Sequence, residues 1–306
     1  MSYFLGIDGG GTKTTCAVGD ETRLLATATA GPSNIVRVGE SEARGSLLRS
    51  VRQACAAAGI APDEVVRTCV GGAGAARPEL AAVVRRILAE ILATPIDVVG
   101  DMQTALEAAF DTGPGVIVNA GTGSFAYGRD RQGKTLRAGG WGFAIGDEGS
   151  AHWIGHEAVS AVLRESERRE DAATLNESSL VKGLYKTWGV NSLLDLARAG
   201  NSVPHPDFAM LFPAVAGSGD EIGRQVLRKA ARELAELAAV VIRRLFVQED
   251  GIVPVAMTGG VFRHAEIVRQ VFYNELRKLE PRAEVNSQVV DPVEGALRIA
   301  RRAAVQ

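Results

Sequence analysis

The sequence predicts an α/β protein of two lobes, in which helices cover largely parallel sheets. Segments typical of strands and of helices alternate along the first third of the chain, which is the order of an α/β fold. A hairpin pattern with glycines in its turn occurs twice, at residues 4–20 and 115–128. The 306 residues are also enough for two domains, each with its own core.

Composition and charge exclude several classes of protein. The chain has 34 Lys and Arg against 36 Asp and Glu, without a long run of one sign, so we expect no nucleic-acid partner. Neither a cleavable signal nor an uninterrupted apolar stretch of membrane-spanning length occurs, so we expect no membrane partner and a cytoplasmic location. Cys16, Cys55 and Cys69 are widely spaced and form no CxxC pair, which argues against disulfides and a cysteine-built metal site.

The first hairpin pattern has a turn rich in glycine. The residues of this turn are Gly9, Gly10, Gly11, Thr12, Lys13 and Thr14. A Walker-type phosphate loop needs GxxxxGK[ST] before a helix, whereas Thr12 precedes Lys13 here and a β-branched, alternating segment follows. The sequence therefore predicts a hairpin between antiparallel strands.

Such a hairpin can still hold phosphate, because several of its backbone N–H groups can point at one anion. Thr12 and Lys13 would add a hydroxyl and a positive charge. Asp8, at the end of the strand, would then lie near the phosphates, where a carboxylate serves Mg²⁺ directly or through water. Asp8 could equally cap backbone amides of the turn, and the pattern alone leaves both roles open.

The next elements alternate between helix and strand. Apolar residues recur at helical spacing from Leu47 to Ala58, and Gly59 ends this helix. A buried strand follows at residues 64–72, then a helix that opens at Pro78 and a strand at residues 95–100.

Asp101 stands at the C-terminal end of that last strand. Open α/β sheets bind ligands at such positions. Asp101 could also cap the next helix, a contribution of about 1 kcal/mol, and the two roles are compatible.

The second hairpin pattern repeats the layout of the first from Gly115. Its turn contains Gly121, Thr122, Gly123 and Ser124. Two such hairpins suggest a polyphosphate held between two lobes. Strand, turn and strand is a common arrangement, however, so the repeat alone could be coincidence.

The segment GGWGFAIGDEGSAHWIG, at residues 139–155, is hard to explain as core packing. Trp141 could offer a flat apolar face to a sugar ring, while its N–H and the Asp147 carboxylate bind hydroxyl groups. His152 and His156 are four residues apart, but no third ligand stands at motif spacing. Packing is therefore favoured over a metal for these two histidines.

The rest of the chain is mainly helical up to residue 246. A strand at residues 252–258 then leads into Gly259, Gly260 and a helix, where the backbone could approach a nucleoside or simply turn. The chain closes with a strand and a helix whose first residue is Pro292.

Six segments together point to a family. In chain order they are GIDGGGTKTT, GDMQTALEAA, VIVNAGTGS, GGWGFAIGDEGSAHWIG, MTGGVF and DPVEGALRIA. They resemble the N-acetylglucosamine kinase branch of the BadF/BadG/BcrA/BcrD ATPase family, within the actin, hexokinase and Hsp70-like (ASKHA) superfamily. The resemblance runs from residue 4 to about residue 300, and the GGWG to GDEGS segment is its most specific part.

The resemblance implies two ribonuclease H-like (actin-like ATPase) lobes, with a nucleotide and sugar cleft between them. The N-terminal lobe would span residues 1–114, joined by the C-terminal helix at 291–306. The C-terminal lobe, with a helical insertion, would span residues 115–290.

The resemblance also assigns roles position by position. It places the ATP phosphates on Gly9 to Thr14 and on Gly121 to Ser124, with Asp8 serving Mg²⁺ through water. Gly259 and Gly260 match the adenosine segment, and Asp101 matches the catalytic base. The positions that match sugar contacts are Asn34, Asp101, Gly140, Trp141 and Asp147.

The activity implied is transfer of the γ-phosphoryl group of ATP to the 6-hydroxyl of N-acetylglucosamine, with glucosamine or a muramyl sugar as the alternative substrate. A homodimer is usual for such relatives. Two alternatives stay open: an ATPase activase of the BadF type, which the cysteine positions disfavour, and a sugar-sensing actin-like ATP-binding protein. The substituent at the sugar's 2-position depends on pocket shape, which no short motif encodes.

Overall fold

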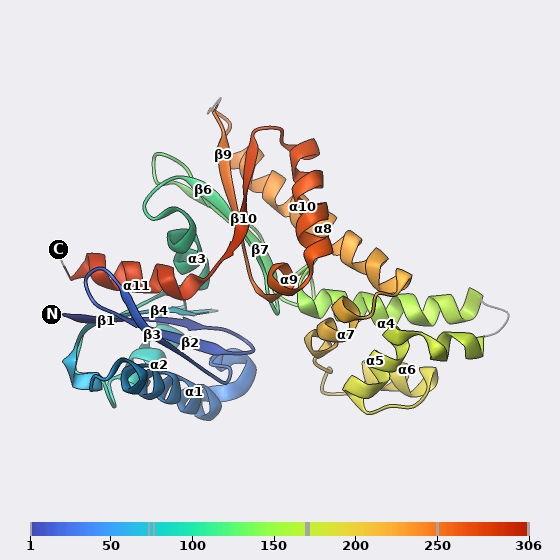
Figure 1. The fold of residues 1–306 in the computed structure, drawn as a ribbon, viewed down its shortest axis with the longest axis horizontal. Coiled ribbons are helices and arrows are strands. Elements are labelled where there is room, and N and C mark those ends of the chain that lie inside the picture. The colour runs from blue at the N-terminus through green and yellow to red at the C-terminus, as the bar shows by residue number, and fades with distance from the viewer. Residues whose placement is uncertain (1, 73, 76, 169–171, 249–250, 305–306) are drawn as a thin grey trace. The chain divides into compact units, whose positions relative to one another are not determined.

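The computed structural model describes residues 2–304 except residues 73, 76, 169–171 and 249–250. The chain forms two compact units, each built on a five-stranded sheet (Figure 1). Unit 1 comprises Met1–Gly113 and Val290–Gln306, and unit 2 comprises Pro114–Val289.

The sheet of unit 1 begins with the predicted hairpin. Its strands are β1 (Tyr3–Gly9), β2 (Thr14–Gly19), β3 (Leu24–Ala30), β4 (Val65–Gly72) and β5 (Ile96–Gly100). They lie in the order β3-β2-β1-β4-β5, with β1 antiparallel to β2 and parallel to β4. Gly9 pairs with Thr14 at the end of the hairpin, so the prediction of antiparallel strands in place of a Walker loop is confirmed.

Helices cover both faces of this sheet. They are α1 (Ile35–Ala58), α2 (Pro78–Leu88), α3 (Asp101–Phe110) and α11 (Pro292–Ala303), with a short 3₁₀ turn η1 (Pro62–Glu64). The side chains of α1 and α2 bury Leu5 and Ile7 on one face, while α11 buries Phe4 and Ala17 on the other (Figure 1). As predicted, Gly59 ends α1, in a left-handed conformation with φ 71° that suits glycine.

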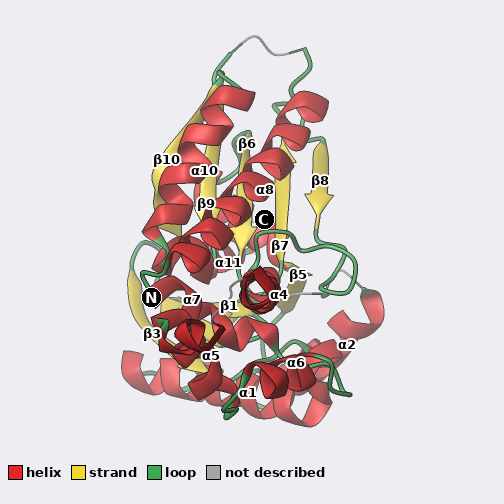
Figure 2. Ribbon diagram, turned by 90° about the vertical axis from the view of Figure 1, so that its right-hand side faces the viewer, coloured by secondary structure: helices red, strands yellow, loops and turns green. Residues whose placement is uncertain are grey.

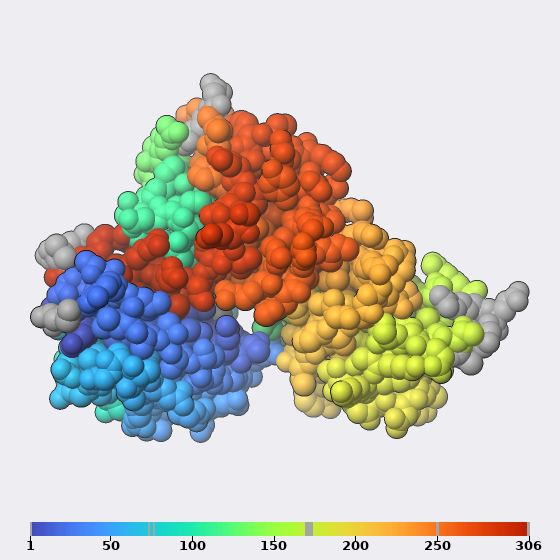
Figure 3. Space-filling view, in the orientation of Figure 1, coloured from blue at the N-terminus to red at the C-terminus, as the bar shows by residue number. Residues whose placement is uncertain are grey.

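The C-terminal helix α11 packs unusually close to its neighbours. A Cβ on Gly6 would lie 2.4 Å from the backbone nitrogen of Leu297, and one on Gly295 would lie 1.9 Å from the carbonyl oxygen of Thr104. Arg301 of α11 also donates to the carbonyl oxygens of Asp20 and Arg23, at 2.7 and 2.8 Å. The two ends of the chain are therefore joined in one core, and the last helix lies against the N-terminal segment (Figure 3).

Unit 2 repeats the topology of unit 1. Its strands are β6 (Gly115–Ala120), β7 (Ser124–Arg129), β8 (Thr135–Gly139), β9 (Val253–Thr258) and β10 (Ala283–Val290). Their order is β10-β9-β6-β7-β8, with β6 antiparallel to β7 and parallel to β9. Each sheet thus has its third strand at one edge, its first in the centre and its last at the other edge, which confirms the predicted duplication.

Unit 2 carries most of the helices. They are α4 (Ala151–Arg168), α5 (Ser179–Trp188), α6 (Leu193–Gly200), α7 (Phe212–Gly217), α8 (Glu221–Leu245), α9 (Gly260–His264) and α10 (Glu266–Leu279), with 3₁₀ turns η2 (Ala172–Glu177) and η3 (Phe208–Leu211). The long helix α8 and α10 run along the sheet (Figure 2). A Cβ on Gly128 of β7 would lie 2.7 Å from Val241 of α8, so glycine lets this helix approach the sheet. Among the described residues, no helix combines the length and apolar character that a membrane span requires.

The edge strands β3 and β8 were not predicted. Most residues of both strands are exposed or only partly buried, so neither shows a continuous apolar run in the sequence. They form because each extends a hairpin whose inner strands are buried.

The close contact between α11 and α3 gives a test of the fold. Replacing Gly295 by alanine places a methyl group against backbone atoms of Thr104 and Ala108, which flexible side chains cannot relieve. We expect Gly295→Ala to lower the free energy of unfolding in urea by about 2 kcal/mol or more, in the range of core overpacking.

Gly217→Ala is the matched control. Gly217 is exposed at the end of α7, has no atom within 4 Å of the added Cβ and needs no positive φ. This variant should change stability by less than about 1 kcal/mol. Equal effects of the two substitutions would contradict the packing described.

Candidate functional site

The turn of the first hairpin is fixed by backbone hydrogen bonds. The Gly10 N–H donates to the Lys13 carbonyl oxygen at 2.9 Å, and the N–H groups of Ser33 and Asn34 donate to the Gly10 carbonyl oxygen at 3.1 and 3.3 Å. A Cβ on Gly9 would lie 2.7 Å from the Ser33 Oγ, so the hairpin and the segment before α1 can approach only with glycine here. The turn and Asn34 are therefore one connected piece.

The side chains of this turn differ in what they offer. Thr12 and Lys13 are exposed, as a phosphate contact requires, and Gly11 is partly exposed. Thr14 is fully buried, and its hydroxyl donates to the Gly31 carbonyl oxygen at 2.8 Å. Thr14 thus supports the turn from within.

Asp8 and Asp101 lie at the same end of the sheet, where the carboxyl ends of its parallel strands meet. Strands β1, β4 and β5 are parallel, Asp8 is the second-last residue of β1, and Asp101 follows β5 directly. Burial, followed by the nearby carboxylates of Asp101 and Asp291, raises the pKa of Asp8 to about 7 against the opposing effect of Lys13. Asp101 and Asp291 are therefore each close enough to Asp8 to disfavour its ionised form.

Asp291 is a member of this group that we did not single out from the sequence. It is the N-cap of α11, and the close packing of α11 on β1 brings it to Asp8. Its position in the sequence could have indicated this role. Asp291 directly precedes Pro292, the first residue of the helix that we expected to return to the first lobe.

Asp101 is the first residue of α3, one position after the N-cap, which Gly100 occupies, so the capping role considered from the sequence is not observed. Its Oδ1 accepts from the Met102 N–H at 3.0 Å, and its carbonyl oxygen accepts from the Thr104 hydroxyl at 3.0 Å. Since a Cβ on Gly71 would lie 2.4 Å from that hydroxyl oxygen, Thr104 packs directly on β4. These contacts fix the orientation of the partly buried Asp101 carboxylate.

Asn34 is the N-cap of α1, and its Oδ1 accepts from the Val36 N–H at 3.1 Å. Within the described part of the chain, the Asn34 amide nitrogen has no hydrogen bond. The nitrogen is therefore available to donate to a hydroxyl group, while the oxygen stays with the helix.

The turn of the second hairpin has a different support. Within the turn, the Gly121 N–H donates to the Gly123 carbonyl oxygen at 2.9 Å. Two N–H groups at the start of α4 also hold the turn: that of Ala151 donates to the Gly121 carbonyl oxygen at 2.8 Å, and that of His152 donates to the Thr122 carbonyl oxygen at 3.4 Å. The Ser124 hydroxyl donates to the Glu148 carbonyl oxygen at 2.6 Å. The hairpin is thus attached to the GDEGS segment, which is distant in sequence.

Asp147 joins the second hairpin to the loop of Trp141. It is buried with a positive φ of 63°, and its Oδ1 accepts from the Gly142 N–H at 3.3 Å. Burial raises the pKa of Asp147, and hydrogen bonds from the N–H groups of Gly142 and Ser124 oppose that rise. A Cβ on Gly123 would lie 2.7 Å from the Asp147 carboxylate, so the glycine is needed for this contact.

The loop that starts at Gly140 presents apolar side chains to solvent. Trp141 is 68% exposed, and the Arg137 guanidinium lies 5.0 Å from the centre of its ring. Gly140 adopts a φ of 71°, which few other residues tolerate. Trp141 therefore offers the open aromatic face that a sugar ring needs.

His152 and His156 both pack against Phe208, with ring centroids 5.4 and 5.2 Å apart. Among the described residues, no group of three His, Cys, Asp or Glu side chains is arranged to hold a metal ion. The packing role favoured from the sequence is the one observed. Cys16, Cys55 and Cys69 are free and buried.

Gly259 and Gly260 lie beside the second hairpin. Gly259 has a φ of 101°, and its Cβ would lie 2.3 Å from the Ala120 carbonyl oxygen at the end of β6, so only glycine fits. Gly260 begins α9 and has open space around it.

A cavity of about 320 Å³ lies nearby in unit 2, a volume typical of small-molecule sites. It is lined by His264, Ala265, Glu266 and Ile267 from the junction of α9 and α10, and by residues that include Gly219 and Arg224. The sequence gave no signal for this cavity, because helices distant in sequence form it.

Two sheets of one topology, each with a glycine-rich hairpin between its first two strands, form the pair of actin-like lobes that the resemblance implies. Residues 5–300 match the BadF/BadG/BcrA/BcrD ATPase family. The chain belongs to this family, and the resemblance seen in the sequence is confirmed.

Curated relatives match over nearly their whole length. The chain is 31% identical to the N-acetylmuramic acid/N-acetylglucosamine kinase of Clostridium acetobutylicum, over 98% of this chain and 99% of the relative. It is 30% identical to the N-acetyl-D-glucosamine kinase of Dictyostelium discoideum, over 97% of each chain. A crystal structure from Chromobacterium violaceum, proposed to be an N-acetylglucosamine kinase, has a TM-score of 0.73 at 25% identity and covers 97% of this chain and 98% of its own.

The pKa of Asp8 gives a test of the carboxylate group. The unfolded chain releases this proton near pH 3.8 and the folded chain near pH 7, so stability falls as pH rises through this window. Asp8→Asn carries no such proton. Its free energy of unfolding should exceed that of the wild type at pH 8, by on the order of 1–4 kcal/mol, and the difference should shrink toward pH 4.

Asp20→Asn is a control with the opposite sign. Hydrogen bonds from the backbone N–H groups of Arg23 and Thr22 lower the pKa of Asp20 to about 2. Stability from Asp20 is therefore present above pH 3.8 and lost as pH falls toward 2, so this variant should be less stable than the wild type at pH 8. A pH-independent effect of Asp8→Asn in chemical unfolding would contradict the charge repulsion inferred for Asp8.

Proposed function

We propose that the protein is an ATP-dependent amino-sugar kinase, which transfers the γ-phosphoryl group to the 6-hydroxyl of N-acetylglucosamine or a close relative. The observation that carries the proposal is Asp101, a carboxylate oriented by α3 at the sheet edge where Asp8 and the first hairpin also end. The names of the relatives support a kinase of this substrate class, and they do not favour an activase or a sensor.

The two hairpins bind the phosphates of ATP. Backbone N–H groups in the turns at residues 9–14 and 121–124 serve as donors, apart from those of Gly10, Gly121 and Ser124, which already donate within the protein. Thr12 and Lys13 add a hydroxyl and a charge. Phosphoryl transfer depends mainly on positioning and on offsetting charge, which this equipment provides.

Mg²⁺ is the cation that fits Asp8. Asp8 offers carboxylate oxygens, which are the ligands that Mg²⁺ prefers. A cation at Asp8 would also offset the repulsion that Asp8 experiences from Asp101 and Asp291. When bound with ATP, Mg²⁺ neutralises charge on the phosphates. Asp8 holds it through water, since few protein ligands are typical for this ion.

The nucleoside occupies unit 2. Gly259 and Gly260 allow its close approach to the backbone, and the cavity lined by His264, Glu266 and Arg224 takes the base. That cavity combines apolar walls with a few polar side chains, as nucleoside sites commonly do.

We assign the sugar to Asn34, Asp101, Gly140, Trp141 and Asp147. Asn34 donates to a hydroxyl group, Trp141 stacks on the ring, and Asp147 and Gly140 shape the loop that carries Trp141. Asp101 accepts the proton of the 6-hydroxyl as the oxygen bonds to the γ-phosphorus and the bond to the bridging oxygen of ADP breaks.

We further propose a homodimer in the cytoplasm. Cytoplasmic ATP is the phosphoryl donor that such a kinase requires, and the dimer follows from the family resemblance.

The direct test is to detect the product. Incubation with Mg-ATP and a panel of amino sugars, followed by mass spectrometry, should give a sugar 6-phosphate together with ADP. ATP hydrolysis without sugar should be slow, because the reacting phosphate then lacks its acceptor. Sugar-stimulated ATP hydrolysis without sugar phosphate, or no product from any sugar, would contradict the proposal.

Asp101 provides a second prediction. Asp101→Asn keeps the shape of the side chain but removes the base, so kcat should fall by about 10²- to 10⁴-fold. Asp97→Asn is the control. Asp97 belongs to the same sheet but lies away from the proposed site, and its Oδ2 forms an ion pair with the Arg67 Nε at 2.9 Å. It should keep a kcat within about threefold of the wild type. A normal kcat for Asp101→Asn in a steady-state assay would exclude Asp101 as the base.

A further inference from the structure

Arg137 is an exposed cation next to the ring of Trp141. It lies on the outer face of β8, whose other face packs on the core of unit 2. Gly139 and Gly140, each with a φ of 71°, reverse the chain after Arg137. Trp141 therefore returns over a residue that precedes it by four positions, and the guanidinium carbon lies 5.0 Å from the centre of the indole ring.

The aliphatic part of Arg137 is held between the sheet and this turn. Arg137 pairs with Tyr127 of the neighbouring strand β7. A Cβ on Gly140 would lie 3.3 Å from the Phe125 Cβ and 3.9 Å from the Arg137 Cδ, so the turn packs directly against both residues. Arg137 thus reaches the Trp141 ring from within a paired strand.

The charge of Arg137 has no acidic partner in the part of the chain that the structure describes. Its guanidinium forms no ion pair and no hydrogen bond there, which leaves the indole ring as its principal contact. A guanidinium is attracted to the electron-rich face of an indole, most strongly where water is excluded. The backbone beside Trp141 is fixed as well, because the Gly142 N–H donates to Asp147.

A ring that is already oriented binds a sugar better than a mobile one. Ordering an exposed side chain on binding costs conformational entropy, and Trp141 is 68% exposed. A cation that holds the ring beforehand removes part of that cost. Its attraction also grows when a bound sugar displaces water from around the ring.

We propose that Arg137 is a positioning residue, which holds the Trp141 ring by a cation–π contact in the orientation that stacks on the sugar. The guanidinium covers one face of the ring, so the sugar takes the opposite face. The inference rests on the proposed kinase function and adds a residue that supports its sugar site. In this role Arg137 acts through Trp141 and makes no contact with the reacting atoms.

Steady-state kinetics with Mg-ATP and N-acetylglucosamine test this role. Arg137→Ala should raise KM for the sugar by at least about fivefold, because the ring must then be ordered on binding. The kcat should stay within about threefold of the wild type, and KM for ATP should not change, since stacking contributes equally before and during the reaction. Arg137→Lys keeps a cation at the ring and should recover part of the affinity, whereas the neutral Arg137→Gln should not.

A double-mutant cycle separates positioning from direct contact with the sugar. Trp141→Ala should itself raise KM for N-acetylglucosamine. In that background, Arg137→Ala should change KM by less than about twofold, because the ring on which Arg137 acts is absent. Equal effects of Arg137→Ala in the two backgrounds would show an action independent of Trp141 and would overturn the proposal.

Lys134→Ala is the matched control. Lys134 is an exposed cation directly before β8, so its removal changes the charge of the hairpin as Arg137→Ala does. Its KM and kcat should equal those of the wild type. An unchanged or lower KM in Arg137→Ala, with sugar phosphate still formed, would overturn the role of Arg137 alone, whereas no sugar phosphate from the wild-type protein would contradict the proposed function itself.

Discussion

The packing of the last helix on the first strand is the constraint on which unit 1 depends. Gly6 and Gly295 have no side chain, so α11 reaches β1 and α3 at distances where any Cβ would collide with backbone. This contact brings Asp291 to Asp8 and holds α3, which begins with Asp101. Arg298 strengthens it by donating to the carbonyl oxygens of Glu107 and Ala108 at the end of α3, both at 3.1 Å.

The two hairpins occupy the same place in their sheets but have different supports. The first is held by N–H groups of Ser33 and Asn34, so its turn is connected to a residue of the proposed sugar site. The second is held by α4 and by Asp147, which also binds the loop of Trp141. In each unit, the turn proposed to bind phosphate is thus joined directly to a residue of the proposed sugar site. Such contacts give binding of one substrate a physical route to affect the other.

The elements that the sequence predicted are those with strong local signals. The hairpin at Gly9, the helix stop at Gly59 and the helix start at Pro292 each depend on backbone preferences of glycine or proline, which are visible in a few residues. The duplicated hairpin was visible for the same reason, and the family resemblance supplied the roles of Asp8 and Asp101.

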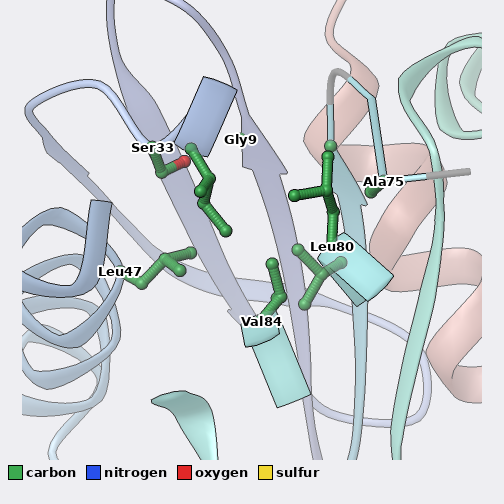
Figure 4. A pocket seen from close by; sticks show the side chains of 9 residues that line it. Gly9, Ser33, Leu47, Ala75, Leu80 and Val84 are labelled. Carbon is green, nitrogen blue, oxygen red and sulfur yellow. The ribbon is translucent and has the colours of Figure 1, made fainter. Parts of the chain in front are cut away.

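What the sequence could not predict depends on contacts between distant segments. Asp291 meets Asp8 only because α11 packs on β1, and the cavity at His264 is shared by helices distant in sequence. The edge strands β3 and β8 are too exposed to leave a clear apolar pattern. A small pocket at Leu80 (Figure 4) is formed by segments from four parts of unit 1, so it too has no local signal in the sequence.

The central claim is that Asp101 is the base that receives the proton of a sugar 6-hydroxyl. A crystal structure with N-acetylglucosamine and a non-hydrolysable ATP analogue would measure the distance between that oxygen and the Asp101 carboxylate. The account predicts about 2.6–3.2 Å, a hydrogen bond. A sugar bound elsewhere, or a 6-hydroxyl that meets a different residue while Asp101 faces away, would contradict it.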